Sequence, residues 1–194
     1  MTGRTVLLAL LLPIGFAFAN GDGPATLPDR EDAPTVGSNA EATPPPRRDA
    51  FAFMPRGGGD LLPRVYGTPE ARAEVLARTQ SVEDWQADIA ADAPDMPETE
   101  ARTLAAYLAN VTPTTEAELP PDGRTLALRH CQSCHSLFTG YLMQRRDRQA
   151  WLGTFASPFH GPIDMSAQEK AIFADYSAIN MPMQVGDVPA ELRF

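Results

Sequence analysis

Residues 129–137, RHCQSCHSL, hold the only two cysteines of this 194-residue chain, Cys131 and Cys134, and His135 follows them directly. Three chemistries use two cysteines at this spacing: a dithiol redox site, a structural zinc site and covalent attachment of a haem. A dithiol site of the thioredoxin type follows a strand, and no strand pattern precedes these residues. A structural zinc ion needs four ligands, but the chain offers only two cysteines and three histidines, without a second close-spaced pair.

Attachment of a haem would use every functional residue of the C-x-x-C-H pattern. Cys131 and Cys134 would each form a thioether with one vinyl group of the porphyrin, because the two-residue gap suits those neighbouring substituents. His135 comes next, where its imidazole can reach the iron as an axial ligand. The motif therefore predicts one covalently bound haem c.

The first residues of the chain predict export. Arg4 supplies a positive charge, residues 6–16 form an apolar run, and Ala17-Phe18-Ala19 is a small-x-small cleavage site. We expect a signal peptide over residues 1–19, with an uncleaved anchor as the alternative, and a periplasmic location. No later segment is long and apolar enough to cross a bilayer, so we expect no membrane span in the mature chain.

Helix-capping patterns recur along the sequence, and no stretch alternates convincingly with period two, which predicts an all-α fold. The expected capping residues are Thr68, Ser81, Asp122, Asp147 and Ser166. A further helix is expected over "ETEARTLAAYLANV", in which four apolar residues fall on one face. Residues 112–123 contain three prolines and are typical of a linker.

The composition divides the chain into four parts. Residues 20–63 are rich in proline and glycine and predict a disordered lead segment, in which "FAFMP" (51–55) is an apolar island able to dock on the folded body. Residues 64–113 predict a helical module, and residues 114–194 the domain that carries the cysteines.

The two helical parts are similar to each other. Tyr107 and Tyr176 coincide at an offset of 69 residues, and a three-residue shift in the preceding loop aligns Trp85 with Trp151. In this register "VYGTP" stands where the other part has "CQSCH". The similarity predicts a degenerate copy that has lost its haem, with chance resemblance between amphipathic helices as the alternative.

The motif and its surroundings resemble a known family. "GRTLALRHCQSCHSL", followed by "RRDRQAW" and "SAQEKAIFADYSAIN", is similar to the mono-haem class I type c-cytochrome domain over about residues 120–185. The resemblance is strongest to the short form associated with periplasmic dehydrogenases. It implies a cytochrome c-like helical domain, here accompanied by a similar haemless half-domain, in which the last helix packs across the first.

The resemblance also implies a distal methionine in the loop before the last helix, where this chain offers only His160 and Met165. Met165 directly precedes a capping serine and is typical of a hydrophobic staple. Met181 and Met183 follow the last helix in "NMPM", whereas the corresponding stretch of the other part reads "NVTP". We expect Met181 to be the sixth ligand of the iron, with Met183, His160, Met165 and an open position as alternatives.

The charge balance restricts the partners. The chain has 25 acidic and 16 basic side chains, a formal net charge of -9, which disfavours nucleic acid as a partner. It suits a redox protein with a basic docking face, such as a periplasmic dehydrogenase, although acidity can also serve solubility alone. We expect an electron carrier and not an enzyme. The alternatives are a haem enzyme or small-molecule sensor with an open sixth iron position, and a haem-free dithiol redox protein.

Overall fold

The computed structural model describes residues 49–194. The expected signal peptide and most of the expected lead segment lie outside the described residues. The described range is helical and contains no strand, which confirms the predicted all-α fold. Its α-helices are α1 (Gly58–Val65), α2 (Pro69–Leu76), α3 (Val82–Asp92), α4 (Glu98–Val111), α5 (Gly123–His130), α6 (Arg148–Thr154) and α7 (Ala167–Asn180). None of the helices in this range combines the length and apolar character that crossing a bilayer requires.

The predicted helix starts are confirmed. Thr68, Ser81, Asp122 and Asp147 each accept a hydrogen bond from the backbone N–H three residues further on. At α7 the cap is reciprocal: Ser166 Oγ accepts from the N–H of Glu169 at 3.1 Å, and Glu169 Oε2 accepts from the N–H of Ser166 at 2.7 Å. The bond from the N–H of Ser166 to the carboxylate is the main cause that lowers the pKa of Glu169 below its usual value.

The predicted boundary at residue 63 is wrong, because α1 extends across it. The glycine run at the start of α1, residues 57–59, is compatible with flexibility, but in the structure it is closely packed. A Cβ atom on Gly57 would lie 2.0 Å from Oδ2 of Asp122, and one on Gly58 would lie 2.3 Å from Cβ of Tyr107. Leu61 and Leu62 of the same helix are buried. The ordered body therefore begins earlier in the chain than composition predicts.

The apolar island 51–55 packs on the C-terminal half, which we define as residues 114–194. Met54 is only 3% exposed and belongs to the hydrophobic core of that half. Tyr176 Oη donates to the carbonyl oxygen of Pro55 at 2.7 Å, and Arg124 donates to that of Phe51 at 2.8 Å. The docking expected for this island is thus present in the structure.

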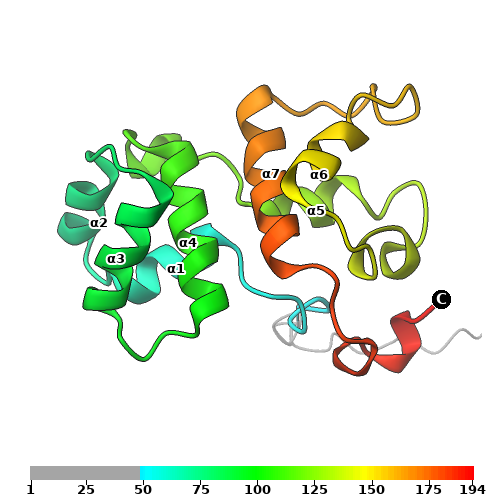
Figure 1. Ribbon diagram of the computed structural model, residues 1–194, viewed down its shortest axis with the longest axis horizontal. Coiled ribbons are helices and arrows are strands. Elements are labelled where there is room, and N and C mark those ends of the chain that lie inside the picture. Colours follow the sequence, from blue (N-terminus) through cyan, green and yellow to red (C-terminus); the bar gives the residue numbers. More distant parts are fainter. Residues whose placement is uncertain (1–48) are drawn as a thin grey trace, which may run out of the picture. The chain divides into compact units, whose positions relative to one another are not determined.

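The helices form two groups that meet through α4 and α7 (Figure 1). In the N-terminal half, residues 58–113, α1 and α3 pack on α4; in the C-terminal half, α5 and α6 pack on α7. The corresponding helices α1 and α5 have eight residues each, and α4 and α7 have 14 each. A hydrophobic core lies in each half.

A tight contact between a glycine and a tyrosine occurs at corresponding helix crossings of the two halves. Gly58 of α1 lies against Tyr107 of α4, and Gly123 of α5 lies against Tyr176 of α7, where a Cβ atom on Gly123 would be 2.1 Å from Cβ of the tyrosine. Such spacing allows two helices to cross at close range only if one has no side chain at the crossing. The two halves therefore share this glycine–tyrosine crossing, whereas the predicted loss of a haem from the N-terminal half stays a prediction. After the stretch that matches the cysteine motif, the N-terminal half continues as α2, whereas the C-terminal half forms a π-helical turn over Phe138–Leu142.

Candidate cofactor site

The motif Cys131 to His135 lies where the chain bends directly after α5. Asp122 fixes the start of this helix, because its Oδ1 accepts from the N–H of Thr125 at 2.9 Å. Leu126 and Ala127 are fully buried in the C-terminal core. The N–H of Cys131 continues the helical pattern by donating to Ala127 at 2.8 Å. The first cysteine is therefore held rigidly at the end of a packed helix.

A cavity of about 360 Å³ adjoins the motif, and we call it the motif cavity. Both cysteines of the chain and all three of its histidines border it. The histidines are His130, at the end of α5, His135 of the motif, and His160 in the loop between α6 and α7. The tertiary fold thus brings every cysteine and histidine of this protein to one site.

The wall of the motif cavity is aromatic. Trp151 of α6 and Phe173 of α7 meet edge to face with ring centroids 5.8 Å apart, and Tyr141 lies 5.3 Å from Trp151. Phe155 packs on Phe173 at 5.4 Å. The hydroxyl of Tyr141 is paired with Ser177 Oγ at 2.9 Å, so the buried phenol is satisfied inside the protein. The wall is both apolar and fixed in position.

Two polar atoms at the motif cavity have no partner within residues 49–194. The indole Nε1 of Trp151 and the Nδ1 of His160 are both buried and form no hydrogen bond. An unpaired polar group in the interior destabilises a protein by about 1–3 kcal/mol, and a bound ligand is one way to pair it. An apolar cofactor with polar substituents would suit this cavity.

The two thiols differ in their surroundings. Cys131 is partly buried, whereas Cys134 is exposed, and its Sγ lies 3.6 Å from Ser133 Oγ. Burial, together with the nearby Cys134, raises the pKa of Cys131 to about 12. Neither cysteine forms a disulfide. Cys131 is therefore a protonated thiol at neutral pH.

His135 is positioned by its immediate neighbours. Its ring is exposed, and Nδ1 lies 3.3 Å from the carbonyl oxygen of Ser136. A Cβ atom on Gly140 would lie 2.1 Å from this same Nδ1. The absence of a side chain at Gly140 thus leaves room for the imidazole at the edge of the motif cavity.

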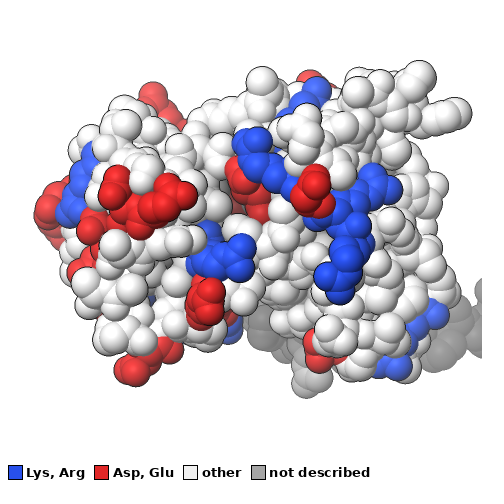
Figure 2. All heavy atoms as spheres, viewed as in Figure 1, with Lys and Arg blue, Asp and Glu red and all other residues white. Residues whose placement is uncertain are grey.

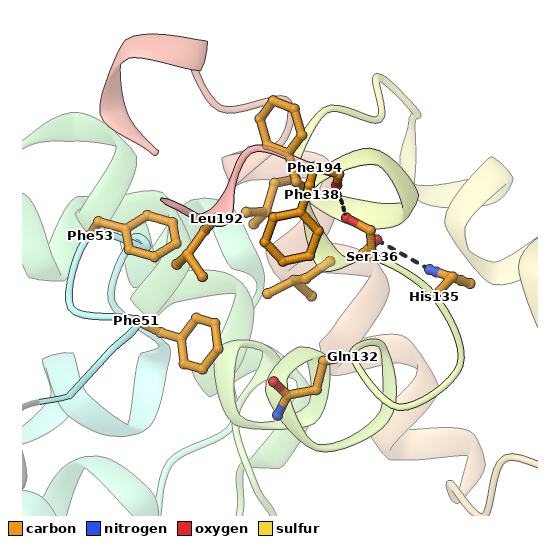
Figure 3. A pocket seen from close by; sticks show the side chains of 10 residues that line it. Phe51, Phe53, Gln132, His135, Ser136, Phe138, Leu192 and Phe194 are labelled. Carbon is orange, nitrogen blue, oxygen red and sulfur yellow. Dashed lines mark hydrogen bonds between the residues drawn. The ribbon is translucent and has the colours of Figure 1, made fainter. Parts of the chain in front are cut away.

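A second cavity, of about 390 Å³, also borders His135 (Figure 3). Phe51 and Phe53 enter it from the N-terminal segment of the described range, and Phe194 from its C-terminal end. Ser136 Oγ donates to the carbonyl oxygen of Phe194, next to the motif histidine. Both ends of the described range therefore support the segment that contains the motif.

The candidates for the sixth ligand of the iron differ in whether they border the motif cavity. His160 borders the motif cavity, whereas Met181, Met183 and Met165 are not among the residues that line it. Met181 is 6% exposed and belongs to the C-terminal core, as does Met165. The N–H of Met183 donates to the carbonyl oxygen of Leu142 at 2.9 Å.

Sequence reasoning did not identify Tyr141, Phe155, Phe173 and Gly140 as parts of the site. Buried aromatic residues in helices have the same spacing whether they face a core or a cavity, so no local pattern distinguishes the two cases. In the described range, no group of three or more His, Cys, Asp or Glu side chains is placed to hold a metal ion. A haem does not need such a cluster, because the porphyrin itself binds the iron and the protein supplies only the axial ligands.

Charge is distributed unevenly over the described surface (Figure 2). Carboxylates gather over α2 and α3, and α3 itself contains Glu83, Asp84, Asp88 and Asp92 without a basic residue. Arginines are more prominent over the C-terminal half. On the face in view, the carboxylates therefore lie mainly over the half that lacks the cysteines.

No protein-family model matches this chain, and neither a curated protein nor a solved structure shows a significant similarity to it. The chemistry of the site is therefore inferred from its own residues.

Proposed function

We propose that this protein is an exported electron-transfer protein with one covalently attached haem c. The observation that carries the proposal is the meeting of both cysteines and all three histidines at one aromatic cavity. A C-x-x-C-H motif alone can occur by chance. Its combination with an apolar cavity that borders both thiols and the motif imidazole is what attachment of a porphyrin requires.

Different residues of the chain would hold the haem, bind its iron and surround it. Cys131 and Cys134 would hold the haem as thioethers, and His135 would be an axial ligand. When bound, the haem supplies a one-electron redox centre. The aromatic wall would keep water away from that centre, and a polar substituent of the haem would pair the indole N–H of Trp151, which has no partner in the described range. Exclusion of water and fixed ligands would limit how far the surroundings of the iron rearrange when its charge changes during electron transfer.

The protonation state of Cys131 argues against a haem-free dithiol function. A dithiol redox protein depends on a nucleophilic thiolate with a lowered pKa. Burial instead raises the pKa of Cys131 to about 12. Cys131 therefore lacks the thiolate that such a redox site uses.

The partner is proposed to be a redox protein with a basic docking face, such as a periplasmic dehydrogenase. The carboxylates on α3 and the formal net charge of -9 would attract such a surface over a long range. This attraction would weaken as ionic strength rises. The N-terminal half would then contribute docking while the C-terminal half holds the redox centre.

The test is to export the full chain in a host with haem-ligation machinery and measure its mass and its reduced-minus-oxidised spectrum. The proposal expects one haem added to the mass of the polypeptide. Replacement of both cysteines, Cys131→Ser with Cys134→Ser, should remove the covalent haem, whereas Ser133→Ala between them should keep it. A colourless wild-type protein with both thiols free to alkylate would overturn the proposal.

A further inference from the structure

We infer that His160 is the second axial ligand of the haem, so that two imidazoles, from His135 and His160, bind the iron. This inference rests on the proposed function. It departs from the methionine that the family resemblance implies, and from Met181, which the sequence favours.

The position of His160 is the first argument. His160 borders the motif cavity together with Cys131, Cys134 and His135, although it lies 25 residues beyond the motif. Its Nδ1 is buried and has no hydrogen-bond partner within the described range. A half-buried imidazole of this kind normally pairs with protein or water, because leaving it unpaired is unfavourable. Because Nδ1 itself is buried, a metal in the cavity would be bound through Nε2, the other ring nitrogen of His160.

The loop around His160 is closed by its own backbone. The N–H groups of His160 and Gly161 both donate to the carbonyl oxygen of Ser157 at 3.0 Å. The N–H of Ile163 then donates to the carbonyl oxygen of His160 at 3.1 Å. These turns pair both backbone polar groups of His160, while the residue borders the motif cavity. The following residues, up to the buried Met165, anchor the loop to the C-terminal core.

The methionines are occupied elsewhere. Met181 is in the C-terminal core at the end of α7, and its N–H donates to the carbonyl oxygen of Ser177 at 2.9 Å. To reach the motif cavity, its side chain would have to leave the core. Met183 is partly buried against the same core, and its N–H donates to the carbonyl oxygen of Leu142. Ligation by His160 requires no such exchange of core contacts.

Two imidazole ligands would have a functional consequence. An occupied sixth position prevents small molecules from reaching the iron, which favours electron transfer over catalysis or sensing. A methionine ligand raises the reduction potential relative to a histidine. The protein would therefore operate at a lower potential than a carrier of the same fold with one histidine and one methionine.

The test uses the haem-loaded full chain, with haem content established by mass. The ferric wild type should be low-spin by electron paramagnetic resonance and should lack the sulfur-to-iron charge-transfer band. His160→Ala should convert the iron to a high-spin form, and the reduced variant should bind carbon monoxide. Met181→Leu is the matched control and should leave the spectrum and carbon monoxide binding unchanged. His160→Met should produce the charge-transfer band and raise the potential.

The outcomes separate this inference from the proposed function. A wild type that carries covalent haem but shows the sulfur-to-iron band would overturn the inference and leave the proposed function intact. Loss of that band in Met181→Leu would assign the ligand to Met181. Rapid carbon monoxide binding by the reduced wild type would indicate an open position. If His160→Ala fails to load haem, the wild-type spectra alone still decide between imidazole and thioether.

Discussion

Asp122 joins the N-terminus of α5 to that of α1, because its Oδ2 accepts from the N–H of Gly59 at 3.0 Å while its Oδ1 accepts from α5. The two residues are 63 positions apart in the sequence. One buried carboxylate thus caps a helix in each half of the described chain. Negative charge at a helix N-terminus is favourable, so both helices benefit.

Replacement of Asp122 should therefore be more costly than loss of an ordinary cap. Asp122→Ala removes two acceptors and should lower the free energy of unfolding by about 1–4 kcal/mol, roughly the sum of two cap losses. Asp147→Ala, which removes the single cap of α6, is the matched control and should cost about half as much. Denaturant unfolding measures both values. Equal losses would contradict the shared cap.

The contact between α5 and α7 should tolerate no side chain on Gly123. A Cβ atom there would lie 2.1 Å from Cβ of Tyr176 and 3.0 Å from the backbone oxygen of Ile172. Gly123→Ala should therefore separate the helices and destabilise the protein by about 1–3 kcal/mol. At Gly153 of α6 nothing lies within 4 Å of a Cβ atom, so Gly153→Ala should be neutral or stabilising. Thermal unfolding of the two variants distinguishes packing from a general effect of alanine.

The two tryptophans provide a test of the cofactor site. Trp85 of α3 and Trp151 of α6 are both buried, and neither indole N–H has a partner in residues 49–194. Only Trp151 borders the motif cavity. In the haem-loaded protein, Trp151→Phe should cost more than Trp85→Phe by about 0.5–1.5 kcal/mol, the usual value of one hydrogen bond. The comparison is made by denaturant unfolding of both loaded variants. Equal costs would mean that the cofactor gives Trp151 no partner.

The tyrosines predict the response to alkali. All four, Tyr66, Tyr107, Tyr141 and Tyr176, have a raised pKa because of burial, and the pKa of Tyr66 rises to about 12. A raised folded pKa means that the unfolded chain loses these protons first. Stability should therefore be full below pH 10 and fall as the pH rises above it.

Spectroscopic titration measures this response directly. Phenolate absorbance should stay low through pH 10 and then increase together with the loss of helical circular dichroism. A phenol that ionises near pH 10 while the helices remain intact would show that at least one tyrosine is accessible to water in the native state.

The sequence alone determined the features that depend on neighbouring residues. Helix caps such as Ser166 with Glu169 connect groups three residues apart, so their pattern is visible without a fold. The same holds for the spacing of Cys131, Cys134 and His135, which defines the attachment chemistry whatever surrounds it. The all-helical class followed from these local signals, and the structure confirms it.

Only the tertiary structure decided which distant residues meet. The start of α1 depends on Tyr107 and Asp122, which lie far along the chain, so a glycine run that is typical of a flexible segment became a packed helix. In the same way, the direction in which His160 or Met181 points is set by loop closure and core packing rather than by sequence distance from the motif. Those contacts bring His160 to the cavity and keep Met181 in the core, because burial is a property of the whole fold and not of a local pattern.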